Sequence, residues 1–207
     1  MIKVENIKVY NLANALYSAR NPLQSWDKST SDRDSNILCD ADLELAKKLY
    51  KAGSEHRKWM RQAFVSMDVT APLYWWKEAD QYKVGTVTDS ESTMHCIHKK
   101  QFMMDDFSHD QLSGSGISTL EYVVGILNYN REKYLETKNK DYWWQIIQLL
   151  PTSYNQMRTW TANYEVCANI ISQRKTHKLD EWVTFCDILL RELPYLREIM
   201  DFGTEDA

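Results

Sequence analysis

An asparagine and an arginine in the last quarter of the chain have a spacing that could build a binding site. Asn163 and Arg174 lie eleven residues apart in RTWTANYEVCANIISQR, a segment with the apolar periodicity of a helix. At about 100° per residue, eleven residues return to within about 20° of the same direction, roughly 16 Å further along the axis. The two side chains are therefore predicted to share one helix face. Asn169 should point about 120° away from Asn163.

A guanidinium on the apolar face of a helix needs an anion, because burying it unpaired costs several kcal/mol. One interpretation is an ion pair between Arg174 and Glu165, Asp180 or a more distant acid, and spacing alone favours it. The other interpretation is a ligand phosphate or carboxylate held by the guanidinium.

Two further segments carry residue types suited to anions. In WWKEADQYK, Lys77 and Lys83 stand beside aromatic rings and could hold a phosphate and a stacked heterocycle. The alternative for this segment, favoured in isolation, is an amphipathic helix whose charges face water. In DSESTMH, Ser92 and its neighbouring hydroxyls could cradle an anion, but the run has no nucleotide-binding glycine spacing.

No motif selects a catalytic residue. The chain has no Ser/His/Asp order, no HExxH and no phosphate-binding loop, and its histidines lack the spacing of metal ligands, so no metal site is predicted. The four cysteines are scattered and are predicted to be free thiols. From these residues alone, we expect a domain with an anion site of unknown chemistry.

The elements that position these segments are predicted from hydrophobic periodicity and from turn residues. Pro72 should begin a helix that carries Tyr74 to Tyr82, and Gly53 should end an earlier one. The polar segment 24–40 is predicted to be a mobile loop. The expected strands are 2–10, 62–69 and a strand or irregular stretch from 83 onward; the expected helices are 11–22, 41–53, 71–82, 119–137, 160–175 and 180–200.

This order, with strands early and helices late, predicts an α+β protein, and no composition break divides residues 1–207 into more than one domain. No apolar run approaches the roughly 20 residues of a membrane span, and the first residues lack the pattern of a secretory signal, so we expect a bacterial or viral cytoplasm. A net charge of −4 argues against a general affinity for nucleic acids. The 8 Trp and 12 Tyr are typical of an aromatic-lined ligand site, a core or an oligomer interface.

One longer stretch resembles a known family. LPTSYNQMRTWTANYEVCANIISQR is similar to the C-terminal signature of the flavin-dependent thymidylate synthases, the ThyX family. In that signature, L-P is followed by a variable piece, by W-T-x-N, and by an arginine eleven residues after the asparagine. Here these positions are Leu150-Pro151, Trp160 to Asn163, and Arg174. The resemblance extends patchily over most of the chain.

The resemblance implies a ThyX-like fold, an antiparallel sheet with a helical bundle, assembled as a homotetramer whose active sites combine subunits. It also implies an enzyme that transfers a methylene from methylenetetrahydrofolate to dUMP and reduces it with a flavin hydride supplied by NADPH. In that setting Asn163 and Asn169 would touch FAD in different subunit contexts, and Arg174 would bind dUMP.

The basic residues of the family pattern are largely replaced. Its R-H-R flavin motif falls on Gln81, Tyr82 and Lys83, and the S-x-R nucleotide motif falls on Ser92-Thr93-Met94. Each lost charge-assisted contact is worth about 1.5–3 kcal/mol, so several losses would weaken FAD and dUMP binding by orders of magnitude. An R-Q pair of the family becomes Lys77-Glu78; side chains that could compensate are Lys77, Lys83, Arg158 and His95.

Three functional hypotheses follow. The first is a flavin-dependent enzyme that methylates dUMP or a related pyrimidine nucleotide. The second is a nucleotide-binding protein without redox chemistry, sequestering or regulatory, on the ThyX fold. The third is a structural oligomer. Under the first hypothesis the resemblance assigns FAD contacts to Gln81, Tyr82, Lys83, Asn163 and Asn169, and nucleotide contacts to Lys77, Glu78, Ser92 and Arg174.

Overall fold

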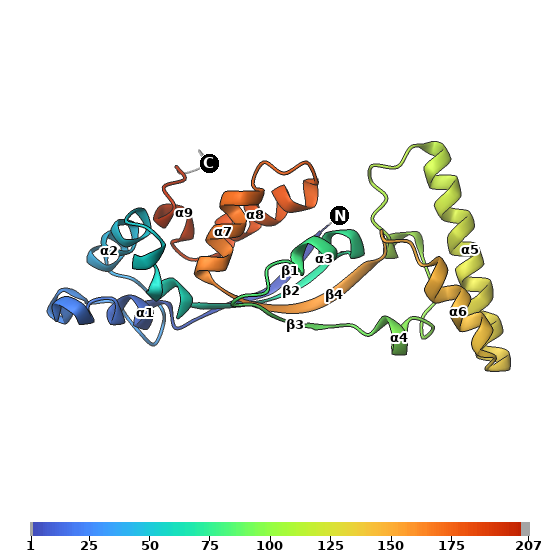
Figure 1. Cartoon of the computed structure of the whole chain (residues 1–207), viewed down its shortest axis with the longest axis horizontal. Helices are drawn as coiled ribbons and strands as arrows, with labels where there is room; N and C mark the ends of the chain where they lie inside the picture. The colour runs from blue at the N-terminus through green and yellow to red at the C-terminus, as the bar shows by residue number, and fades with distance from the viewer. Residues whose placement is uncertain (1, 204–207) are drawn as a thin grey trace. The chain divides into compact units, whose positions relative to one another are not determined.

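The four strands of the described residues form one antiparallel sheet (Figure 1). The computed structural model describes residues 2–203, so Met1 and 204–207 of the predicted 1–207 domain lie outside the described residues. The strand order is β1-β2-β4-β3. The strands are β1 (Lys3–Tyr10), β2 (Phe64–Pro72), β3 (Val87–Ser90) and β4 (Asn155–Asn163). The predicted α+β class with an antiparallel sheet is confirmed, but β4 corrects the expectation that all strands come early.

Contacts within the chain define two compact units, each assembled from three separate segments. Of the described residues, unit 1 comprises 2–3, 69–81 and 89–158, and unit 2 comprises 4–68, 82–88 and 159–203. Each of the four strands contributes residues to both units. This interleaving explains why the composition shows no break along the sequence. The single domain predicted for the whole chain stays a prediction.

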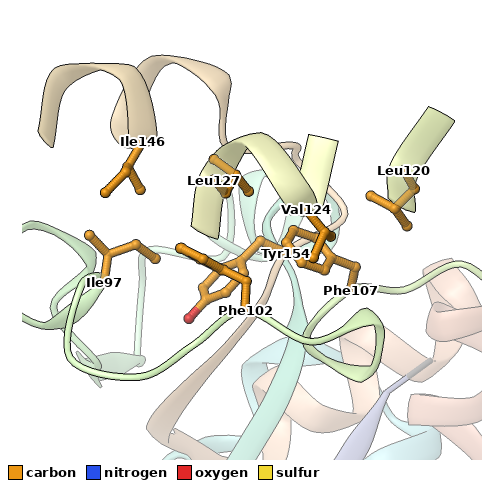
Figure 2. Packing of buried hydrophobic residues seen from close by; sticks show 8 residues of the cluster. All are labelled: Ile97, Phe102, Phe107, Leu120, Val124, Leu127, Ile146 and Tyr154. Carbon is orange, nitrogen blue, oxygen red and sulfur yellow. The ribbon is translucent and has the colours of Figure 1, made fainter. Parts of the chain in front are cut away.

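Unit 1 is built on an aromatic and aliphatic core. Figure 2 shows Tyr154 beside Phe102 and Phe107, below residues of the long helix α5 (Gly114–Thr137). The Phe107 and Tyr154 ring centroids lie 5.6 Å apart in an edge-to-face arrangement. The remaining helices are α3 (Leu73–Ala79), α4 (Thr93–Cys96), the 3-10 turn η5 (Met104–Asp106) and α6 (Lys140–Leu149).

Helix α6 was not predicted. Asn139 caps it, since its side chain accepts a hydrogen bond of 3.0 Å from the backbone N–H of Asp141. Ile146 of α6 is fully buried in the core of unit 1. Lys138, in the left-handed conformation at the end of α5, reverses the chain between the two helices.

Unit 2 packs helices around buried aromatic rings. Trp160 of β4 stacks on Phe185 of α8 (Asp180–Glu192), with 5.5 Å between ring centroids and 21° between ring planes. Helix α7 (Tyr164–Arg174) packs against α8. The other helices are α1 (Leu12–Ser18), α2 (Asp40–Lys51), α9 (Leu196–Ile199) and the 3-10 turns η1 (Asn21–Leu23), η2 (Trp26–Lys28), η3 (Ser54–His56) and η4 (Lys58–Arg61).

The last predicted helix, 180–200, is broken into two pieces. Helix α8 ends at Glu192, and α9 begins at Leu196. Pro194 provides no backbone N–H between them, and Tyr195 adopts a left-handed conformation with φ of 60°. None of the helices within residues 2–203 has both the length and the hydropathy needed to cross a membrane.

The polar segment 24–40 is anchored to a buried carboxylate. The hydroxyls of Ser29 and Ser31 each donate to Asp42 Oδ2 at 2.5 Å, and Arg20 pairs with Oδ1 at 2.6 Å. Burial alone would raise the pKa of Asp42, but these three partners outweigh it and hold the pKa below its usual value. Two hydroxyls of this segment are thus fixed to the fold, while most of its residues are exposed. Its predicted mobility stays a prediction.

Candidate functional site

The junction between β4 and α7 differs from the predicted helix over 160–175. Residues up to Asn163 belong to the strand, and the helix begins at Tyr164. Asn163 is the N-cap of α7, with extended backbone and a side-chain oxygen that accepts from the backbone N–H of Val166 at 3.0 Å. Asn163 and Arg174 therefore do not share a helical face, and the prediction that they do is wrong. The alternating Trp160-Thr161-Ala162 run is the strand signal that the helical pattern concealed.

The segment after α3 lies along α7 within unit 2. The predicted helix over 71–82 ends at Ala79, so Tyr82 lies outside it. The Tyr82 hydroxyl donates to Gln173 Oε1 at 3.0 Å and accepts from Arg174 Nε at 3.0 Å, at the C-terminal end of α7. At the N-terminal end, a Cβ on Gly85 would come within 2.6 Å of the side-chain nitrogen of Asn163.

Gly85 makes this close approach possible. Its φ of +77° is a left-handed conformation that a residue with a Cβ rarely adopts. The Thr86 hydroxyl donates to the backbone oxygen of Tyr82 and closes the turn. The fold thereby brings three of the predicted site residues, Tyr82, Asn163 and Arg174, onto one helix and the turn beside it.

The guanidinium of Arg174 lies against the rings of Tyr82 and Trp182, which together we call the aromatic corner. Its guanidinium carbon is 5.1 Å from the ring centroid of Trp182 and 5.8 Å from that of Tyr82, within the range of cation–π attraction. Trp182 is fully buried and meets Tyr82 edge-to-face at 5.9 Å. Of the acids expected near Arg174, Glu165 is held by Arg61, whose Nη2 donates to Glu165 Oε1 at 3.1 Å. The corner fixes the direction of a half-buried positive charge.

The two predicted flavin asparagines lie in different surroundings. Asn163 is 7% exposed, and its oxygen caps α7. Asn169 is exposed on α7, away from the buried face of that helix. Contact with FAD stays a prediction for both.

The triplet at the position of R-H-R fits a flavin phosphate only in part. Gln81 is exposed, with its amide 3.4 Å from the backbone oxygen of Lys77, and Tyr82 makes the two bonds described above. Lys83 is exposed and is the one member of the triplet with a positive charge. Any phosphate bound here would meet one cation where the family pattern has three basic side chains.

The remaining predicted residues lie in unit 1. Lys77 is exposed and Glu78 half-buried on α3. Ser92 is the N-cap of α4, where its hydroxyl accepts from the backbone N–H of His95 at 3.3 Å. Arg158, considered as a replacement for a lost arginine, pairs with Asp80 at 2.8 Å.

Ser92 also lines a cavity of about 250 Å³ in unit 1. Sequence reasoning did not assign a role to the other residues around it. The only local signal was a pair of lysines at 99–100, a few residues beyond the S-x-R position. The residues that line the cavity are Glu91, Ser92, Thr93, Cys96, Ile97, Lys99, Lys100, Phe102 and Tyr154.

Comparison with protein-family models and with curated proteins finds no match for this chain. Solved structures do match. A crystal structure of Thymidylate Synthase X (ThyX) from Helicobacter pylori with FAD and dUMP superposes with a TM-score of 0.70 and 15% identity, covering 97% of each chain. The chain has the ThyX fold.

A second ThyX-like structure widens the comparison. The UMP/dUMP methylase PolB from Streptomyces cacaoi, bound with 5-Br UMP, matches with a TM-score of 0.65 and 13% identity, covering 98% of this chain and 95% of that one. At these identities the likeness establishes the fold. The predicted ThyX-like fold with a sheet and a helical bundle is thus confirmed, and activity has to be argued from this chain's own residues.

Proposed function

We propose that this protein is a flavin-dependent methylase of a pyrimidine nucleotide, dUMP or a close relative such as UMP, with methylenetetrahydrofolate as the one-carbon donor. The observation that carries the proposal is Arg174, held in an aromatic corner at the end of α7 by Tyr82 and Trp182. The ThyX fold over nearly the whole chain supports it, because solved members of that fold contain FAD and dUMP or brominated UMP.

In this proposal, Arg174 binds the nucleotide phosphate, since a guanidinium offers several N–H donors and a permanent charge. The corner orients it before the ligand arrives, which lowers the conformational entropy lost on binding. The amides of Asn163 and Asn169, with Gln81, Tyr82 and Lys83, hold FAD. Lys77, Glu78 and Ser92 contribute to the nucleotide site.

FAD, reduced by NADPH, would supply the hydride that completes the methyl group. The proposed assembly is a homotetramer with shared sites in the cytoplasm.

A second function is favoured by one specific observation. Only Lys83 is basic where the family motif reads R-H-R, and the Tyr82 hydroxyl beside it is bonded to Gln173 and Arg174. A protein that binds a pyrimidine nucleotide without flavin, to sequester it or to respond to it, needs Arg174 but not the lost arginines.

The absorption spectrum of protein purified without added cofactor separates the two functions. Bound oxidised flavin makes the protein yellow, and the enzyme should then oxidise NADPH faster when dUMP or UMP is present. A thermal-shift screen with FAD, dUMP, UMP and dTMP adds a second measurement, because a ligand that binds the folded state raises the apparent Tm.

Each outcome of this pair of measurements selects one hypothesis. Colourless protein that ignores FAD but responds to a nucleotide supports the second function. A folded protein that responds to none of these ligands contradicts both and leaves the structural oligomer.

A further inference from the structure

The cavity that Ser92 lines has an apolar floor of the kind that accepts a ring. Ile97, Phe102 and Tyr154 line it and are 4%, 3% and 7% exposed. All three belong to the core cluster of Figure 2, in which the Tyr154 hydroxyl points away from the residues of α5. Burial, with the charges of Glu91 and Asp106, raises the pKa of Tyr154 to about 12, so its hydroxyl stays protonated at neutral pH. The floor is therefore a buried apolar surface, two-thirds of whose residues are aromatic, with one neutral polar group.

The rim of the cavity carries polar and charged groups. Ser92, Thr93 and Cys96 come from α4 and its N-cap. Of the two lysines, Lys100 pairs with Asp106 at 2.9 Å.

The one acid of the rim also has a local partner. Glu91 accepts a hydrogen bond from the backbone N–H of Met157 at 3.3 Å. Lys99 is exposed, and its ammonium makes no ion pair with any residue between 2 and 203. Lys99 is thus the cation at the rim that remains for a ligand.

Other cations lie near Lys99 and the adjacent His98. Arg131 of α5 donates from Nη2 to the Lys99 backbone oxygen at 3.3 Å, and its Nε is buried without a hydrogen-bond partner among the described residues. Burial lowers the pKa of the neighbouring His98, and the charges of Lys138, Lys99 and Arg131 lower it further. The positive charges of Lys138, Lys99 and Arg131 all act on His98 and repel one another, and a bound anion would relieve part of that repulsion.

The sequence shows which charge is missing near this cavity. Where the resemblance places the arginine of S-x-R, the chain has Met94, which is half exposed and does not line the cavity. Ser92 of the same motif does line it, and so does Lys99, five positions after Met94.

We propose that this cavity binds a pyrimidine nucleoside monophosphate, with the ring on the Phe102 and Tyr154 floor, and that Lys99 supplies the positive charge that Met94 lacks. The inference rests on the proposed nucleotide-binding function and adds the residue that replaces a lost arginine. In a homotetramer with shared sites, Arg174 would reach the same ligand from another copy of the chain.

The alkylation rate of Cys96 can report whether a ligand occupies the cavity. Cys96 lines it and is half-buried; Cys39, in unit 2, is half-buried as well and serves as the reference, while Cys167 and Cys186 are buried. The experiment measures the alkylation rate of each cysteine by mass spectrometry, with and without dUMP, UMP and inorganic phosphate. At dUMP ten times above its Kd, alkylation of Cys96 should slow about tenfold, because only about a tenth of the sites stay open. Alkylation of Cys39 should not change.

Substitution of the lysine tests the assignment of the charge. Lys99→Met should weaken dUMP binding roughly tenfold and reduce its dependence on salt, while Lys99→Arg should retain binding. The matched control is Lys48→Met, which removes an exposed lysine from α2 in unit 2 and should leave the affinity unchanged. Thermal unfolding of each variant verifies that it is folded.

The outcomes distinguish this inference from the function on which it rests. If dUMP raises the Tm but leaves Cys96 unprotected, or if Lys99→Met binds as tightly as the parent chain, the cavity assignment is overturned and the proposed function stands. Protection by inorganic phosphate but by neither nucleotide would reduce the cavity to an anion site and overturn the nucleotide assignment. If neither nucleotide binds the parent chain by any measure, the proposed function fails and this inference fails with it.

Discussion

Arg174 Nε donates a hydrogen bond of 3.0 Å to the hydroxyl of Tyr82, a residue 92 positions away in the sequence. Tyr82 occupies the middle of the triplet that replaces R-H-R, so the chain uses this position to hold the arginine of its C-terminal signature. The hydroxyl is itself fixed, because it donates to Gln173. A residue that departs from the family pattern thereby supports Arg174, the arginine that we propose binds the nucleotide.

Replacing Tyr82 by Phe tests that support. Hydrogen bonds to charged groups are worth about 1.5–3 kcal/mol, which corresponds to about 10- to 150-fold in affinity, so loss of the hydroxyl should weaken dUMP binding by about tenfold or more. Calorimetry measures the affinity. The Nε–H signal of Arg174 in a nitrogen-15 NMR spectrum should also exchange faster with water.

Tyr50→Phe is the matched control for Tyr82→Phe. Arg57 also lies over a tyrosine ring, with its guanidinium carbon 4.0 Å from the Tyr50 centroid, but it donates to the backbone oxygen of Tyr50 and not to the hydroxyl. Removal of that hydroxyl should change neither the affinity nor the Arg174 signal. Unchanged binding in Tyr82→Phe would remove Tyr82 from the site.

Gly85→Ala should destabilise the turn beside α7. The substitution places a Cβ against the Asn163 amide in a left-handed conformation, which costs about 1–3 kcal/mol. The free energy of unfolding in urea measures this loss. Gly125→Ala provides the opposite case, because an added Cβ there meets nothing within 4 Å and alanine favours a helix interior by about 1 kcal/mol. Equal stability of the two variants would contradict the close packing at Gly85.

Asp42 should make the free energy of unfolding depend on pH in the acidic range. Its pKa is depressed in the folded chain, so the stabilisation is fully present above the unfolded value of 3.8 and is lost as the pH falls through the folded value. Asp42→Asn should cost about 3–5 kcal/mol at neutral pH, because it leaves Arg20 buried without its anion. Unfolding curves between pH 3 and 7 measure this, and the variant should show a flatter profile.

An exposed ion pair is the control for Asp42. Lys133 and Glu136 pair at 2.8 Å on the surface of α5, and the Glu136 side chain is 66% exposed. Exposed pairs contribute about 0–1 kcal/mol, so Glu136→Gln should leave stability nearly unchanged. A comparable loss in both variants would mean that burial of Asp42 is not what makes its pair strong.

His98 should report on an anion at the neighbouring lysine. It faces the Tyr134 ring at 5.0 Å and the cations Lys138, Lys99 and Arg131, and its pKa lies below the ordinary value of 6.5 because of burial and these charges. The folded chain therefore binds fewer protons than the unfolded chain just below pH 6.5, and stability falls as the pH drops through that range. A phosphate beside Lys99 should move the pKa of His98 upward, and an NMR titration with and without dUMP measures the shift. A pKa that dUMP leaves unchanged would place the phosphate elsewhere.

Local signals in the sequence predicted much of the fold. Pro72 does stand at the start of a helix, and Gly53, with φ of 118°, follows the end of α2. The β4–α7 boundary was misplaced because Trp160 and Asn163 fit a helical period as well as they fit a strand followed by an N-cap. Helix α6 was missed because its stability depends on the burial of Ile146 against distant parts of unit 1, which periodicity alone does not show.

The candidate site was predictable only where it is local. The resemblance to the family signature made Arg174 a candidate, but the partner that orients it, Tyr82, lies far away in the sequence. The sequence does not point to Lys99, because its proposed role depends on a cavity that residues within 91–102 form together with Tyr154. Such long-range juxtaposition leaves no periodic signal in a single sequence.

The interleaving of the two units also limits how the protein can be made and divided. Unit 1 lacks part of its chain until Arg158 has been synthesised, and unit 2, whose chain starts at Val4, lacks α7 and α8 until the last fifth of the sequence has followed. A ribosome therefore exposes unpaired strands and unburied rings for most of translation, which favours aggregation of the nascent chain. No single cut between 4 and 203 separates the units, so neither can be expressed as one continuous piece or exchanged as a cassette during evolution.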